Sequence, residues 1–420
     1  MKVLWITNII FPEEECLLSG SSDFKSSGGW MLGAANNLIK QNGIKLFVAN
    51  VSDKVRKLTI LKGHSIEYYV IPLGSRGNIK INTDYVEYWK EIIAIVQPDV
   101  VHIHGTEFSH GHAYMSSNSC HNVVLSIQGL TSVCYRHFLS GLSFIDVLKN
   151  LTIRDLVFGT MFSHRKLYKS RGAYEKEMIC MAENIIGRTN WDRSHSWAIN
   201  PKASYFFCNE TLREEFYDNS VWKYAKCKKH SIFLSQGGNP IKGLHQVLKA
   251  MPYILLHYPD VTIRIAGIDI TKNISFADKL RLTGYGLYIK KLIRKLKLED
   301  KVHFTGNLNA QEMKDEYLKA NVFICPSSIE NSPNSLGEAQ ILGVPCVASY
   351  VGGIPDMMLG NENNLYRFED VEVLALKVCQ IFDNKDNQVD MRSIANERHN
   401  PELNSTMLSN IYKNIMLKKV

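Results

Sequence analysis

The feature that most constrains the fold is a short apolar run, NVFICPS at 321–327, with a polar loop and a helix-forming stretch after it. A continuous apolar run bounded by Pro and Ser is typical of a strand buried on both faces of a parallel sheet. The polar residues 327–334 are predicted to form the loop at the carboxyl end of that strand. A helix is predicted to start near Pro333 or Asn334. The chain is therefore predicted to belong to the α/β class.

Two carboxylates, Glu330 and Glu338, stand on either side of this predicted helix start. Open α/β sheets bind ligands beyond the carboxyl ends of their strands, and the first turn of a helix offers N–H groups to an anion. Carboxylates accept hydrogen bonds from hydroxyls, so a ligand with phosphates in the middle and polyols at both ends fits this pattern. A nucleotide sugar is such a ligand. The simpler alternative is a solvated loop residue and an exposed helix residue.

The order and spacing of residues 326–355 resemble the donor-binding region of family 4 (group 1) retaining glycosyltransferases of the GT-B fold. The resemblance implies two Rossmann-like domains facing a cleft. It also implies metal-independent transfer of a sugar from a nucleoside diphosphate to a hydroxyl, with retained configuration. It rests on Glu330-x7-Glu338, Gly343-Val-Pro345 and Gly352-Gly353-x-Pro355.

The resemblance gives each matching donor-site residue an expected role. Glu338 would bind the ribose hydroxyls and Glu330 the hydroxyls of the donor sugar. The amides of Ser335 and Leu336 would bind the distal phosphate, while Lys242 would bind the diphosphate and support its departure. Chemistry would then lie in stabilising the leaving diphosphate, and no side chain needs to be a strong nucleophile.

Two glycine-containing turns are expected near the phosphates, because Gly has no Cβ to keep a ligand away from the backbone. A long polar loop over 12–29 is predicted to end in Gly28 and Gly29, which by the resemblance lie over the diphosphate. The second glycine-containing turn is the one that leads to Lys242. Relatives carry an Arg there, but this chain has Gln236 or Gly237 at that place, so one cation is missing from the predicted site.

The predicted strand 99–105 places His102 and His104 on one face, since side chains alternate along a strand. His-x-His suggests a metal, but no third ligand stands at a plausible spacing, and neither metal nor cofactor is expected. A hydrogen-bonded histidine pair is the alternative. The resemblance places this strand end near the acceptor, which makes His104 a candidate catalytic residue. It also puts Gln128 where many relatives have a His that contacts the donor sugar.

Arg188 and Asp192 follow the last predicted strand of the first domain. They are candidates for contact with the acceptor or with a donor phosphate, and Arg188 is a hypothetical substitute for the missing Arg. The alternative is a structural ion pair between Arg188 and Asp192.

Residues 143–171 combine an apolar helical stretch with a cationic cluster that starts at His164. Such a segment suits an anionic membrane surface, where apolar side chains insert and Lys or Arg meets phosphates. It equally suits a helix that packs on a core and has a solvated basic edge. Membrane docking is favoured slightly, because many relatives use lipid-linked acceptors.

The whole chain sets outer limits on these predictions. Its 420 residues suit two domains, predicted at 1–205 and 230–395, with a crossing at 206–229 and a last helix at about 400–420 that packs back on the first domain. No apolar run is long enough to span a bilayer, and no signal peptide is recognisable, so the protein is expected in the cytoplasm. A formal charge of +8 is modest for this length, and no nucleic-acid partner is expected.

The predicted function is a retaining hexosyltransferase that uses a UDP-sugar as the favoured donor and a glycan or lipid-linked acceptor, in cell-surface polysaccharide synthesis. A nucleotide-sugar epimerase and a catalytically silent nucleotide-sugar-binding subunit are the alternatives. The silent subunit is motivated by the lost Arg and His. An NAD-dependent oxidoreductase is disfavoured, because no G-x-G-x-x-G follows the first predicted strand.

Overall fold

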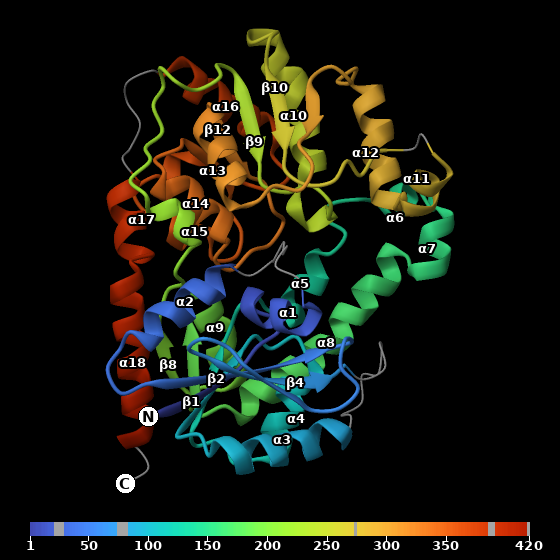
Figure 1. Cartoon of the computed structure of the whole chain (residues 1–420). Coiled ribbons are helices and arrows are strands. Elements are labelled where there is room, and N and C mark those ends of the chain that lie inside the picture. Colours follow the sequence, from blue (N-terminus) through green and yellow to red (C-terminus); the bar gives the residue numbers. More distant parts are fainter. Residues whose placement is uncertain (21–28, 74–82, 273–274, 385–390, 418–420) are drawn as a thin grey trace. The chain divides into compact units, whose positions relative to one another are not determined.

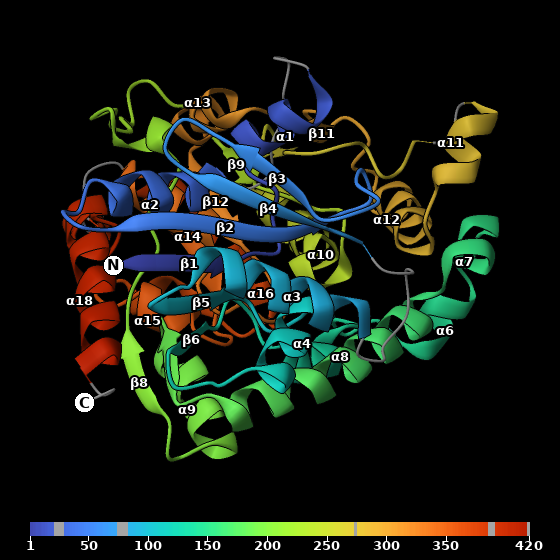
Figure 2. The same cartoon turned by 60° about the horizontal axis from the view of Figure 1, so that its bottom comes forward.

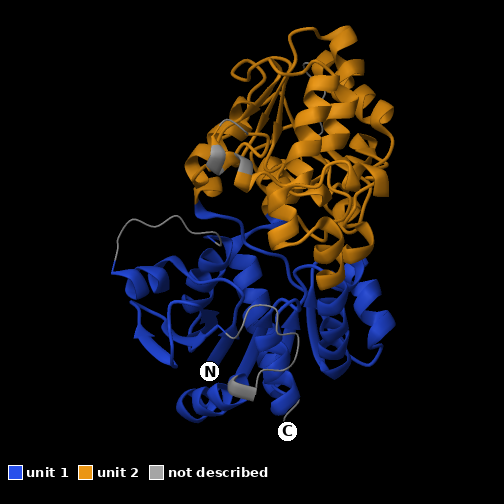
Figure 3. Cartoon of the chain, turned by 90° about the vertical axis from the view of Figure 1, so that its right-hand side faces the viewer, with its two compact units in different colours: residues 1–133, 169–214, 397–420 blue, residues 134–168, 215–396 orange. Residues whose placement is uncertain are grey.

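The computed structural model describes residues 1–20, 29–73, 83–272, 275–384 and 391–417. The predicted phosphate-loop residue Gly28 therefore lies outside the described residues. The chain divides into two compact units, coloured separately in Figure 3. Unit 1 comprises residues 1–133, 169–214 and 397–420, and unit 2 comprises residues 134–168 and 215–396.

Unit 1 is built on a sheet with the strand order β3-β4-β2-β1-β5-β6-β7-β8. Among the described strands, β3 pairs antiparallel with β4 and the other neighbours pair parallel, as the apolar runs predicted. The strands are β1 (Lys2–Ile6), β2 (Lys45–Ser52), β3 (Thr59–Lys62), β4 (Glu67–Pro72), β5 (Val100–His104), β6 (Val123–Ser126), β7 (Asn184–Gly187) and β8 (Ser204–Phe207).

Helices cover both faces of this sheet, which explains why both faces of β1 are apolar and buried. Val3 and Trp5 of β1 pack in the cluster that includes α2 and α18, whereas Leu4 and Ile6 pack in the cluster that includes α3, α4 and α8. The helices are α1 (Pro12–Ser19), α2 (Gly29–Ile39), α3 (Thr83–Val96), α4 (Ser109–Ser117), α5 (Thr131–Cys134), α8 (Met161–Met181, which belongs to unit 1 from residue 169 onward), α9 (Asn190–Ile199) and α18 (Pro401–Leu417).

The predicted polar loop over 12–29 is wrong in its first part, because α1 occupies Pro12–Ser19. Pro12 starts the helix, three Glu residues follow in its first turn, and Gly20 ends it in the left-handed conformation. Glu14 is fully buried and accepts hydrogen bonds from the Phe11 amide and the Asn50 side chain. The polar composition of this segment favoured a loop, although the segment forms a helix with a buried carboxylate.

Unit 2 contains a parallel sheet with the order β11-β10-β9-β12-β13-β14. Its strands are β9 (Ser231–Leu234), β10 (Thr262–Ile265), β11 (Val302–Phe304), β12 (Val322–Cys325), β13 (Cys346–Ser349) and β14 (Leu365–Tyr366). The strands β9 and β12 are neighbours, so the loops that follow them meet at one edge of the sheet.

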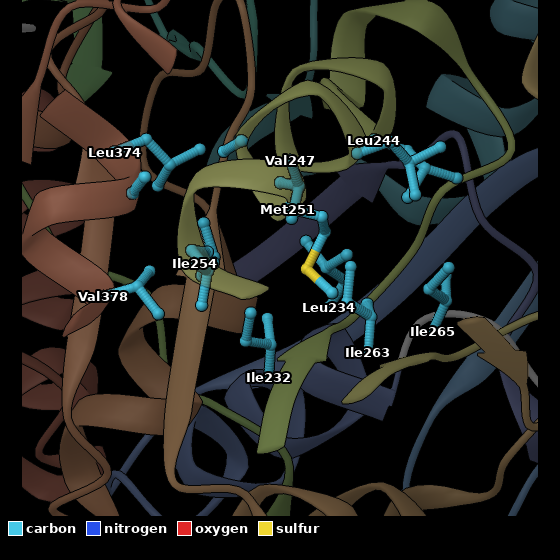
Figure 4. Close-up of a cluster of buried hydrophobic side chains, with 14 of the residues drawn as sticks. Ile232, Leu234, Leu244, Val247, Met251, Ile254, Ile263, Ile265, Leu374 and Val378 are labelled. Atoms are coloured by element: carbon cyan, nitrogen blue, oxygen red, sulfur yellow. The ribbon is translucent and has the colours of Figure 1, made fainter. Parts of the chain in front are cut away.

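The core of unit 2 lies between this sheet and helices α10, α12 and α16. Figure 4 shows Ile232 and Leu234 of β9 facing Val247, Met251 and other side chains of α10. The ring of Phe233 lies on the opposite face, against Tyr317 and Phe323. The helices are α6 (Phe144–Leu148), α7 (Ile153–Phe158), α10 (Leu244–His257), α11 (Phe276–Arg281), α12 (Gly284–Lys295), α13 (Ala310–Lys319), α14 (Asn334–Ile341), α15 (Ile354–Met357), α16 (Val371–Asp383) and α17 (Arg392–Arg398).

The units differ from the predicted domains in two segments: residues 134–168, and the predicted crossing 206–229, which is divided between the units after Glu214. Residues 134–168 belong to unit 2 and interrupt the predicted first domain, 1–205. The physical reason is that Leu142 and Val147 are part of the unit 2 core. The last helix, α18, packs against α2 within unit 1, as predicted. Within the described part of the chain, no helix has the length and apolarity needed to span a membrane.

Candidate functional site in two parts

In unit 2, the loops that follow β9 and β12 are tied to each other through backbone contacts. The Ser328 amide donates to the Ile241 carbonyl over 2.7 Å. Gly243 has φ +71°, and a Cβ at this position would lie 1.7 Å from the Pro326 carbonyl oxygen. Any other residue would therefore push the two loops apart, and this requirement explains the Lys-Gly pair at 242–243.

The two loops bring Lys242 and Glu330 together, although 88 residues separate them in the sequence. Lys242 Nζ lies 2.5 Å from Glu330 Oε1, and their side chains are 26% and 16% exposed. Burial lowers the pKa of Lys242, but the charge of Glu330 and its hydrogen bond outweigh that effect, so the pKa is raised. The lysine stays charged beside a carboxylate at the carboxyl edge of a parallel sheet.

Glu330 is fixed from its main chain and from its side chain. The Gly353 amide donates to the Glu330 carbonyl over 3.0 Å. A Cβ at Gly352, where φ is +54°, would lie 1.8 Å from the same carbonyl oxygen. Ser327 Oγ donates to Glu330 Oε1 over 2.8 Å. The Gly352-Gly353 pair therefore positions the carboxylate, which gives those glycines a physical role.

Helix α14 begins at Asn334, as predicted, but Pro333 takes the N-cap position without a side-chain cap. Glu338 on this helix is only 5% exposed, and the Tyr317 hydroxyl lies 3.4 Å from Glu338 Oε2. The same hydroxyl donates to the Ser335 carbonyl over 2.9 Å. The Leu336 amide donates to the Pro333 carbonyl over 3.0 Å, so a phosphate at Leu336 would have to share or replace that bond.

Gln236, at the place of the family's Arg, is exposed on the loop after β9. Its amide group carries no charge, so Lys242 is the cation that this loop contributes.

In unit 1, the two histidines of β5 differ in their surroundings. His102 is fully bonded, because Nδ1 lies 2.6 Å from the Tyr412 hydroxyl and Nε2 lies 2.6 Å from Ser126 Oγ. Both ring nitrogens of His102 therefore have hydroxyl partners, which agrees with hydrogen-bonded histidines as the alternative to a metal site. His104 stacks on His102 with ring centroids 3.8 Å apart.

His104 lines a cavity of about 50 Å³ together with Trp5, Trp30 and Arg188. Its Nε2 atom is buried and has no hydrogen-bond partner among the described residues. Burial, assisted by the Arg188 charge, lowers the pKa of His104 to about 3. The imidazole is neutral at physiological pH and can exchange a hydrogen bond with a group that enters the cavity.

Arg188 contacts Asp192 through its main-chain amide, and its guanidinium pairs with another carboxylate. The Arg188 guanidinium pairs with Glu210 and donates to the Ile127 carbonyl over 2.8 Å. Asp192 is fully buried in α9, where it accepts from the Arg188 amide and the Tyr205 hydroxyl. Asp192 thus has no surface to offer an acceptor. The Arg188 charge is already balanced by Glu210, which argues against its use as a substitute cation.

The two remaining predicted donor contacts lie in unit 1. Gly29 begins α2, and its Cα lies close to the Arg213 side chain, since a Cβ would be 3.6 Å from Arg213 Cγ. Gln128 is half-buried in the segment that follows β6. Sequence patterns missed Ser327, Tyr317, Glu210 and Tyr412. The first is a common loop residue, and the others act across 18 to 310 residues of sequence, which no local pattern records.

The fold matches that of solved structures over nearly the whole chain. Sucrose-phosphate synthase from Thermosynechococcus elongatus superposes with a TM-score of 0.70 at 14% identity, over 100% of both chains. HepE from Anabaena in complex with UDP superposes with a TM-score of 0.63 at 13% identity, over 99% of this chain and 100% of HepE. The chain therefore has the GT-B fold.

The sequence of the second half matches a family of glycosyltransferases. Residues 218–398 match the family described as "Glycosyl transferases group 1". The predicted resemblance is thus confirmed at the level of group 1, while assignment to family 4 stays a prediction.

Two curated relatives are similar over shorter stretches. The gpi3 subunit of phosphatidylinositol N-acetylglucosaminyltransferase from Schizosaccharomyces pombe is 23% identical over 66% of this chain and 55% of its own length. WcaL from Salmonella typhimurium, named provisionally as a colanic acid biosynthesis glycosyltransferase, is 29% identical over 38% of this chain and 44% of its own. The chain spans about half the length of these relatives.

Proposed function

We propose that the chain is a retaining glycosyltransferase that moves a sugar from a nucleoside diphosphate to a hydroxyl of a glycan or lipid-linked acceptor. The observation that carries the proposal is the Lys242–Glu330 pair, held at the edge of the unit 2 sheet by Gly243 and Gly352. A cation for a diphosphate and a carboxylate for sugar hydroxyls stand side by side. Glu338 is proposed to bind the ribose from the following helix.

The proposed reaction needs no strong protein nucleophile. Lys242 leaves Glu330 and binds the diphosphate, while Glu330 turns its acceptor oxygens to the sugar hydroxyls. The bond between the anomeric carbon and the diphosphate oxygen breaks, and the acceptor oxygen bonds to that carbon on the same face. A diphosphate oxygen takes the acceptor's proton. Lys242 stabilises the negative charge that builds on the leaving group.

The donor and acceptor are proposed from the similar proteins. HepE was solved with UDP, which supports a UDP-sugar. The S. pombe relative is named for a phosphatidylinositol acceptor and WcaL for colanic acid synthesis, which supports a lipid-linked or polysaccharide acceptor at the inner face of a membrane. We propose a role in cell-surface polysaccharide synthesis, without a metal ion in catalysis.

The test is a panel of UDP-, GDP- and ADP-sugars incubated with the purified chain, with measurement of donor binding and of nucleoside diphosphate release. Release from one donor, with retained anomeric configuration in the product by NMR, is expected. Binding without release, even with lipid and glycan acceptors present, would favour the silent subunit, and conversion of the sugar without acceptor would favour an epimerase. Absence of binding would refute the donor site.

A further inference from the structure

The outward side of helices α6 and α7 in unit 2 consists of large apolar side chains. Six of them are more than half exposed, with fractions from 59% at Ile145 to 73% at Leu156. Extended exposed apolar surfaces of this kind mark interaction sites in folded proteins. We call these six residues the α6–α7 surface: Phe144, Ile145, Ile153, Leu156, Val157 and Phe158.

Two polar residues of the same segment, Asn150 and Asp155, point inward. Asn150 and Asp155 are only 5% and 7% exposed. Asp155 Oδ2 accepts from the Thr152 amide over 3.0 Å, and Gly284 at the start of α12 packs against it so closely that a Cβ would lie 2.6 Å from that oxygen. A helix at a water-facing surface normally turns its apolar side inward and its polar side to the solvent. The anchored inner side shows that the apolar side chains are presented outward by the fold.

Cations lie next to the apolar side chains. Figures 1 and 2 show α6 and α7 beside α12 and α11, and Lys291 Nζ of α12 donates to the Lys149 carbonyl over 3.1 Å. Residues 284–298 carry five Lys or Arg and no Asp or Glu. Residues 143–168 carry four Lys or Arg against two Asp, and both of these Asp cap helices.

We propose that the α6–α7 surface docks on a lipid bilayer that carries anionic lipid. The apolar side chains would enter the headgroup region, and Lys149, Lys291 and Arg294, all exposed, would contact lipid phosphates. An identical copy of the chain is a poor occupant, because a two-fold contact would bring the same cations together. The inference adds a docking surface to the proposed membrane-face location, and its test does not depend on the proposed sugar transfer.

The test is cosedimentation of the purified chain with phosphatidylcholine vesicles, and with vesicles that also contain about 30 mol% phosphatidylglycerol. Binding to the anionic vesicles is expected, with weakening at high salt. The double variant Leu156→Ser/Phe158→Ser should weaken binding by more than about tenfold, since it removes two large apolar side chains from the inserted surface. Lys149→Glu should weaken binding by at least about fivefold.

A matched control is Leu256→Ser, which removes an apolar side chain that is 80% exposed on α10, outside the surface. It should bind vesicles like the unchanged chain. Circular dichroism and nucleotide binding check that each variant is folded, and because vesicle binding needs no sugar donor, its failure would leave the proposed transfer untouched.

Three results would overturn the proposal. One is absence of binding to the anionic vesicles by the folded chain. Another is equal binding by Leu156→Ser/Phe158→Ser and by the control. The third is a dimer in sedimentation velocity that the double variant abolishes, because the surface would then serve self-association.

Discussion

Replacing Gly243 by Ala should separate the two loops that hold the candidate donor site. Gly243 has φ +71°, where an L-residue costs roughly 1–2 kcal/mol. In addition, the new Cβ would lie 1.7 Å from the Pro326 carbonyl oxygen. Since real Cβ contacts stay beyond about 3 Å, the backbone of one loop must move by more than about 1 Å, and the total cost should reach about 3–5 kcal/mol.

The control for Gly243→Ala is Gly43→Ala, because Gly43 has φ +80° with no heavy atom within 4 Å of the added Cβ. Gly43→Ala incurs the backbone cost alone, so urea unfolding of the two variants isolates the loop collision. Donor affinity, measured by calorimetry, should fall by more than about tenfold in Gly243→Ala and stay unchanged in Gly43→Ala. Equal stability losses in the two variants would refute the reasoning about loop contact.

Three further substitutions test individual side chains. Lys242→Ala should lower turnover by about 10²–10³ if it stabilises the leaving diphosphate, and a near-normal rate would assign that role to another cation. Glu338→Ala should weaken nucleotide binding through lost ribose contacts, and unchanged affinity would remove Glu338 from the site. Burial raises the pKa of Glu14 to about 7, so the folded chain keeps a proton that the unfolded chain releases above about 4.5. Stability should fall by up to about 3 kcal/mol between pH 4.5 and 7, and Glu14→Gln should remove that slope in thermal unfolding; an unchanged slope would contradict it.

Helices and strands could be predicted where the periodicity of apolar residues agrees with the residues that start or end an element. The helix predicted to start near Pro333 or Asn334 is α14, which begins at Asn334. The strand predicted within 321–327 is β12, because both faces of that strand are buried. Helix α1 was missed because its first turn is acidic and its buried residue is a carboxylate, Glu14. The sequence does not show that Asn50 of β2 donates a hydrogen bond to this carboxylate.

The candidate site could be predicted only where residues lie close in sequence. The loop from Glu330 to Glu338 was located from its local pattern, and so was Lys242. Their contact was not, because nothing at either position reports that the loops after β9 and β12 lie side by side. The same limit explains why the Glu210 partner of the Arg188 guanidinium was missed, since Glu210 lies beyond β8, while the nearer Asp192 accepts from the Arg188 main-chain amide.

The Lys242–Glu330 pair bears on how a site with Gln236 in place of Arg could work. The two side chains are largely buried, so removing one partner leaves a poorly solvated charge on the other. A free nucleoside diphosphate would take Lys242 but leave Glu330 facing phosphates without a donor. A complete nucleotide sugar would offer its phosphates to Lys242 and its hydroxyls to Glu330 at once. Under the proposed assignment, the site therefore favours the intact donor, and the pair re-forms as the product departs. A single lysine can then serve both binding and release, because its resting partner is the residue that recognises the sugar.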